Sequence, residues 1–155
     1  MKRVLIIISV IGIGIAYWLI SPLLINKRVN EGIEDIIVKQ KNIPEVATSS
    51  IITLKQGNFT GLAGHNAEGV VKLLKTGDVF YLRFEDDFRV TNGPDIFVYF
   101  GKNNSYDPAG KIALLKGNVG AQNYEIIEAI NPLNYDEIWI WCRSFSVPFG
   151  KATLQ

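Results

Sequence analysis

Apolar residues dominate the start of the chain in a pattern that the rest does not repeat. Two basic residues lie on each side of an uncharged apolar run, residues 4–25. A helix of that length is about 33 Å long, enough to cross a hydrocarbon core of about 30 Å. The pattern predicts an N-terminal membrane anchor over residues 1–28. A cleaved signal peptide is the less favoured alternative, because its apolar core is shorter and ends in an A-x-A-like site.

Residues 29–50 are predicted to form a juxtamembrane stalk. Ile33, Ile36 and Ile37 recur at helical spacing, which predicts a short amphipathic helix that ends before Pro44. A spacer that holds the following domain away from the membrane is favoured over a helix that binds a partner.

From residue 51 onward, short apolar segments alternate with glycine, proline, asparagine and aspartate. IITLKQ, GVVKLL, VFYLRF, DIFVYF, KIALLK, QNYEII, EIWIWC, SFSVPF and KATL each have the length and composition of a strand. This spacing predicts one all-β domain over residues 51–155, an antiparallel β-sandwich of about 8–9 strands, with a barrel as the related alternative. One cysteine cannot form an intramolecular disulfide, so the core must stabilise the domain without one.

The segment 135–154, YDEIWIWCRSFSVPFGKATL, contains two of the three tryptophans and the only cysteine. In a strand, alternate residues from Ile138 to Cys142 face one side, and those from Trp139 to Arg143 face the other. Both faces are mostly apolar. The segment is therefore predicted to be a central strand covered on both sides, or one whose tryptophan face binds a partner.

Charge and motifs exclude several classes of function. The chain has 16 basic and 15 acidic residues, without the excess of basic residues that nucleic-acid binding requires. The glycine-containing loops GNFTGLAGHNAEG and LKGNVGAQNY lack the spacing that cradles phosphate before a helix. G-x-S-x-G and H-E-x-x-H are absent, which makes a hydrolase the third and most distant hypothesis.

Several segments together resemble the DM13 domain: GNF, HNAEGVV, YLRFEDDFRV, NGPDIFVYF, LKGNVGAQNYEI and IWIWCRSFSVPFGKATL. The resemblance covers roughly residues 52–154. It implies a β-sandwich outside the cytoplasm, a characteristic cysteine that corresponds to Cys142, and a role in redox chemistry or electron transfer. With the anchor, it predicts a single-pass cell-membrane protein whose C-terminal domain is extracytoplasmic and meets a redox partner protein.

Counting ligands narrows the redox chemistry. One histidine and one cysteine cannot form a blue-copper site, an iron-sulfur cluster or a c-type haem attachment. Two options remain: non-covalent haem held by His65 or Cys142, and thiol chemistry of Cys142 alone. The acidic run 85–87, with Asp95, is interpreted as solvated turns in preference to a cation site.

Two hypotheses of function come before the hydrolase. In the first, the domain is a membrane-tethered redox module and Cys142 is a reactive thiol or a cofactor ligand. In the alternative, it is a binding or adhesion β-sandwich, and Cys142 is a small buried hydrophobic residue.

Overall fold

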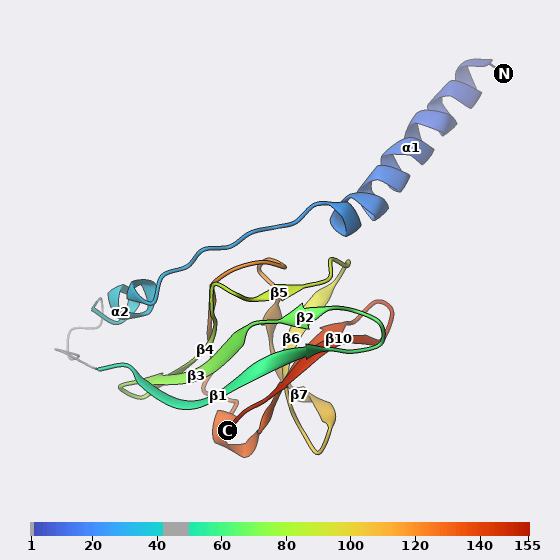
Figure 1. Ribbon diagram of the computed structural model, residues 1–155. Coiled ribbons are helices and arrows are strands. Elements are labelled where there is room, and N and C mark those ends of the chain that lie inside the picture. Colours follow the sequence, from blue (N-terminus) through green and yellow to red (C-terminus); the bar gives the residue numbers. More distant parts are fainter. Residues whose placement is uncertain (1, 42–49) are drawn as a thin grey trace.

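The computed structural model describes residues 2–41 and 50–155 (Figure 1). Two helices, α1 (Lys2–Leu24) and α2 (Glu34–Lys41), precede the β-domain, which also has a short 3-10 helix at Pro132–Asn134. The strands are β1 (Ile52–Gly61), β2 (Ala67–Glu68), β3 (Val70–Thr76), β4 (Val79–Phe84), β5 (Arg89–Val90), β6 (Ile96–Lys102), β7 (Ser105–Leu114), β8 (Gln122–Glu125), β9 (Glu137–Cys142) and β10 (Val147–Thr153). Pro44, which was predicted to end the second helix, lies outside the described residues.

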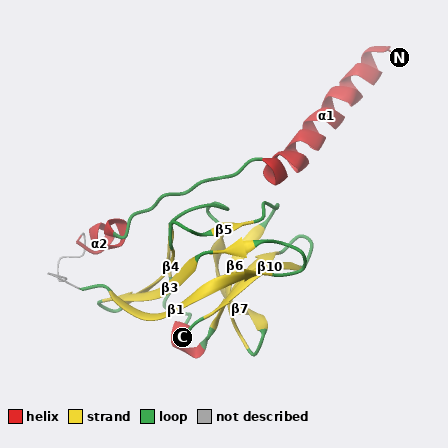
Figure 2. Cartoon of the chain, in the orientation of Figure 1, coloured by secondary structure: helices red, strands yellow, loops and turns green. Residues whose placement is uncertain are grey.

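Eight strands form one antiparallel sheet in the order β7-β6-β9-β10-β1-β3-β4-β8, and β2 pairs with β5 in a small second sheet. The large sheet curls, so that strands far apart in this order face each other (Figure 2). Leu73 and Leu82 of β3 and β4 are buried in the same cluster as Val98 and Ile138 of β6 and β9. The antiparallel β-domain is confirmed, but one curled sheet replaces the two packed sheets of the predicted sandwich.

Three phenylalanines form the aromatic centre of the core. Phe84 lies 4.9 Å from Phe59 and 4.6 Å from Phe88 between ring centroids. Phe59 and Phe84 come from β1 and β4, whereas Phe88 lies in the turn before β5. These contacts join the large sheet to the small one.

The central position of β9 is confirmed, because it pairs with β6 on one side and β10 on the other. Ile138, Ile140 and Cys142 have no exposed surface and belong to the main core. Trp139 is also buried, in an outer cluster that Trp141 joins with part of its surface exposed. Both faces of this strand are therefore covered.

Helix α1 projects away from the sheet (Figure 1). Within the described residues, no helix has the length and sustained apolar character required of a candidate membrane span. The anchor predicted over residues 1–28 thus receives no support from the structure.

Residues 26–36, most of which were predicted to be a spacer, lie against the β-domain; we call this segment the strap. The Val29 N–H donates a hydrogen bond to the Val119 carbonyl at 2.9 Å, and the Glu31 N–H donates to the Ala121 carbonyl at 3.0 Å. The strap therefore forms a parallel bridge, Arg28 with Val119, beside the loop before β8. Helical spacing could not reveal this pairing, because it is made by the backbone.

Side chains also hold the strap in place. The Glu31 carboxylate accepts hydrogen bonds from Lys116 Nζ, at 2.8 and 2.9 Å, and from the Asn123 N–H at 2.7 Å. Ile36 of α2 is 1% exposed and packs in a cluster with Tyr81. Of the three isoleucines predicted to share a helix face, Ile36 is the one that packs α2 against the sheet.

Candidate functional site

Cys142 lies at the end of β9, under the turn that precedes β6. It pairs with Ile96 on one side and Val147 on the other, and it has no exposed surface. Its Sγ–H donates a hydrogen bond to the Pro94 carbonyl at 3.1 Å. The turn 92–95, NGPD, therefore covers the only thiol of the chain.

The NGPD turn is fastened to the chain just after Cys142. Asp95 accepts hydrogen bonds from Arg143 Nε and Nη2, both at 3.0 Å, and from Ser144 Oγ at 2.8 Å. The Arg143 N–H donates to the Asp95 carbonyl at 3.1 Å. These side-chain hydrogen bonds, first from Arg143 and then from Ser144, hold the pKa of the Asp95 carboxyl below its ordinary value.

The ion pair between Arg143 and Asp95 lies at the surface, whereas the Cys142 thiol under the turn belongs to the core. The Arg143 side chain is 58% exposed, and Asp95 has a positive φ of 57°. Positive φ is unfavourable for a residue other than glycine, although aspartate tolerates it better than most. In this conformation the Cys142 thiol cannot touch an external partner, so its reactivity requires the turn to open.

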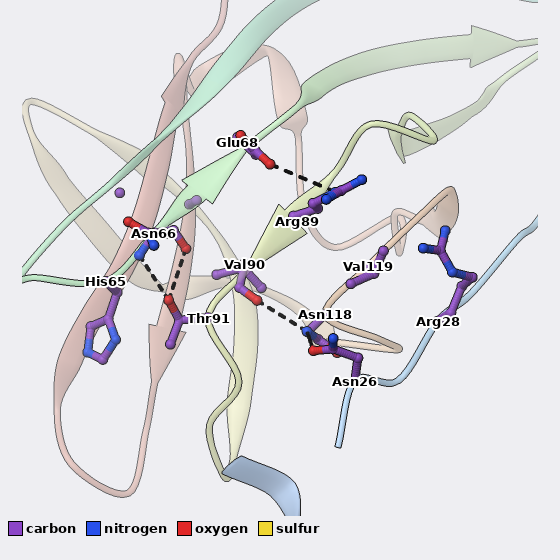
Figure 3. A pocket seen from close by; sticks show the side chains of 12 residues that line it. Asn26, Arg28, His65, Asn66, Glu68, Arg89, Val90, Thr91, Asn118 and Val119 are labelled. Atoms are coloured by element: carbon purple, nitrogen blue, oxygen red, sulfur yellow. Dashed lines mark hydrogen bonds and ion pairs between the residues drawn. The ribbon is translucent and has the colours of Figure 1, made fainter. Parts of the chain in front are cut away.

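His65 occupies different surroundings. Its ring stacks on Phe149, with centroids 3.7 Å apart and an interplanar angle of 11°. It borders an open cavity of about 610 Å³ that Arg28 and Arg89 also line, and Cys142 is not among the lining residues (Figure 3). The structure does not bring the two predicted site residues together.

Neither residue has surroundings that fit haem. The cavity beside His65 is lined mainly by arginine, asparagine, threonine and glutamate side chains, with Ala67, Val90 and Val119 as its few apolar ones. A haem macrocycle requires a largely apolar pocket. Cys142 is packed in the core and already donates to a carbonyl, so no haem face has access to it.

Two residues of the acidic run 85–87, Glu85 and Asp87, make contacts within the protein. Glu85 pairs with Lys72 at 2.8 Å and Arg83 at 3.1 Å; although burial opposes the shift, these two cations lower its pKa. Asp87 accepts a hydrogen bond from the Val70 N–H at 3.0 Å. Across residues 2–41 and 50–155, no group of three or more His, Cys, Asp and Glu side chains could hold a metal ion.

The motif segments that meet around Cys142 belong to one recognised domain. A family model described as "Electron transfer DM13" matches residues 58–154. The chain belongs to the DM13 family. No curated protein and no solved structure matches it.

Two features of this DM13 domain escaped sequence reasoning. The first is the fastening of Asp95 to Arg143 and Ser144, which are nearly fifty positions away in the chain. The second is the cavity between Arg28 and Arg89. Asp95 lies in the motif segment NGPDIFVYF, and Arg143 and Ser144 lie in IWIWCRSFSVPFGKATL, but only the pairing of β6 with β9 brings the two segments together.

Proposed function

We propose that this DM13 domain is a redox module in which Cys142 is the reacting group and the NGPD turn is its cover. One observation carries the proposal: the single thiol lies 3.1 Å from the Pro94 carbonyl, under a turn fastened by an exposed ion pair. Exposed ion pairs contribute little to stability, so a cover held in this way opens more readily than a packed core. The family description as an electron-transfer domain supports a redox role.

The reaction that suits a single thiol is exchange with a disulfide on a partner protein. Once the turn opens, the Cys142 thiol loses its proton to solvent, and the thiolate attacks one sulfur of the partner disulfide. A new S–S bond forms, the partner S–S bond breaks, and the second partner sulfur leaves as a thiolate that takes up a proton. The Cys142 sulfur is oxidised to the disulfide level, the leaving partner sulfur is reduced to a thiol, and the attacked partner sulfur stays in the mixed disulfide.

We also propose that residues 1–28 anchor the protein in the cell membrane and hold the β-domain on the extracytoplasmic side. The uncharged run 4–25 supports this, as do the exposed apolar side chains of α1, which include Ile6 and Ile13. Disulfide-bearing partners are common in oxidising extracytoplasmic compartments. Protease added to intact cells should digest the domain; full protection until lysis, followed by cleavage, would refute this location.

A second candidate function is a binding module in which Cys142 only fills the core. The observation that favours it is the complete burial of the thiol. The two functions differ in one measurable property, the rate at which the native protein exposes this thiol.

Thiol labelling of the full chain in neutral detergent tests the redox proposal. An aromatic disulfide reagent should form a mixed disulfide with native protein faster than global unfolding occurs. Asp95→Asn removes one charge from the fastening and should speed labelling several-fold. Glu68→Gln is the matched control, because Glu68 forms another exposed ion pair, with Arg89 at 3.8 Å. Labelling that follows only global unfolding in all three proteins would reject the redox module and leave the binding module.

A further inference from the structure

The cavity beside His65 combines the strap with the small sheet. Its lining includes Asn26 and Arg28 of the strap, Glu68 of β2 and Arg89 of β5 (Figure 3). At about 610 Å³, it lies in the size range of small-molecule sites. The cavity is much larger than an inorganic ion, so an occupant would carry an organic part.

Backbone pairing sets the distance between the two arginines. Val119 bridges Arg28 on one side and Arg89 on the other, and Arg89 pairs with Glu68. Laterally paired residues project to the same face, and adjacent strands lie about 4.8 Å apart. Two such spacings put the two arginine backbones about 10 Å apart. Figure 3 shows Val119 between them.

The positive charge at this cavity is only partly balanced. Arg89 faces Glu68 at 3.8 Å, and both side chains are about two-thirds exposed, at 64% and 68%. Within the described residues, the Arg28 guanidinium forms no ion pair or side-chain hydrogen bond. Two positive charges, on Arg28 and Arg89, thus line the cavity with one negative charge, on Glu68. The planar guanidinium of Arg28 is available to a ligand.

We infer that this cavity binds a phosphate ester, either a free phosphorylated small molecule or the headgroup of an anionic phospholipid. Guanidinium forks match phosphate oxygens in bidentate geometry, and two forks across one cavity can hold one phosphate group from two sides. Val90 and Val119 line the cavity, and the small part of each that is exposed gives the organic part of the ester an apolar contact. The inference goes beyond the redox role of Cys142; only its lipid source rests on the proposed membrane tether.

Binding is coupled to the strap, because Arg28 reaches the cavity only while the strap is docked. The Val29 N–H donates to the Val119 carbonyl at 2.9 Å, immediately beside the Arg28–Val119 bridge. A ligand that contacts both Arg28 and Arg89 must therefore stabilise the docked strap. Amide hydrogen exchange at Val29 reports this stabilisation separately from affinity.

Calorimetric titration of the full chain in neutral detergent micelles tests the inference. One arm adds glycerol 3-phosphate; a second uses nanodiscs with and without phosphatidylglycerol. Arg28→Gln and Arg89→Gln should each weaken binding about 10-fold or more, since each removes a charged hydrogen-bonding group. Lys102→Gln is the control for charge alone, because Lys102 is exposed on β6 and does not line the cavity.

The outcomes separate the two sources and can overturn the proposal. Binding of glycerol 3-phosphate identifies a soluble ester, and binding only to phosphatidylglycerol discs identifies a lipid headgroup. Failure of both probes, equal affinity for succinate, or unchanged affinity of both arginine variants would each refute the phosphate site. None of these results depends on thiol labelling of Cys142, so failure here is distinguishable from failure of the redox module.

Discussion

Replacing Gln122 with leucine should destabilise the domain severely, although the side-chain volume hardly changes. Gln122 has no exposed surface. Its Nε2 donates to the carbonyls of Gly117, at 2.7 Å, and Gly120, at 3.2 Å. Its Oε1 accepts from the Gly117 N–H at 3.1 Å and from the Tyr124 hydroxyl at 2.7 Å. Leucine would remove all four hydrogen bonds and leave their partners buried.

The expected loss follows from this count of four hydrogen bonds. Each intramolecular hydrogen bond contributes about 1 kcal/mol net, so Gln122→Leu should lower the free energy of unfolding by about 4 kcal/mol. For a domain of this size, that corresponds to a fall in Tm of about 15–25 °C. Thermal melts of the full chain in neutral detergent, followed by circular dichroism, measure it.

A matched control is available in Gln56→Leu, because the Gln56 side chain is exposed on β1. Its effect should stay within about 0.5 kcal/mol. The Gln122 variant should also speed amide exchange at Val29, whose hydrogen-bond partner lies in the loop that Gln122 orders. If the free energies of unfolding of Gln122→Leu and Gln56→Leu differ by less than about 1 kcal/mol, the reasoning is refuted.

Three further predictions concern the strap and pH. Ile36→Ala should release α2 and speed limited proteolysis there, since Ile36 is 1% exposed and such truncations cost about 2–4 kcal/mol; Ile37→Ala, at an exposed position, should not. Burial, and secondly the Glu125 carboxylate, raises the pKa of Tyr81 to about 12. The folded state then holds a proton that the unfolded chain releases above pH 10, so the free energy of unfolding should fall between pH 10 and 12. Urea unfolding at a series of pH values measures this fall, which should be less steep in Tyr81→Phe. Gly120→Ala should lower the free energy of unfolding by about 1–3 kcal/mol, because Gly120 has a φ of +94° and an added Cβ would meet the strap backbone. Amide exchange in the strap should also become faster, and unchanged exchange would contradict that contact.

The sequence by itself determined the local properties of this protein. The two-residue period of a strand grouped Ile138 and Ile140 with Cys142 on one face of β9, and all three are buried together in the core. Turn residues separated the strands, and the motif segments identified the DM13 domain over most of its matched range, residues 58–154. These features depend on neighbouring residues and on the two-residue period of a strand, both of which are visible in a linear pattern.

Only the tertiary structure decided which of these pieces meet. A two-residue period says which face a side chain occupies, but it does not say which strand lies beside it. The pairing of β6 with β9 placed the NGPD turn over Cys142, with the Pro94 carbonyl on its thiol, and so decided between the reachable and the buried cysteine that the sequence left open. Backbone hydrogen bonds hold the predicted spacer against the loop before β8. The Asn123 N–H also donates to the Glu31 carboxylate, 92 positions away in the chain. Such contacts arise from the closure of long loops around a shared core, and no local sequence signal encodes that closure.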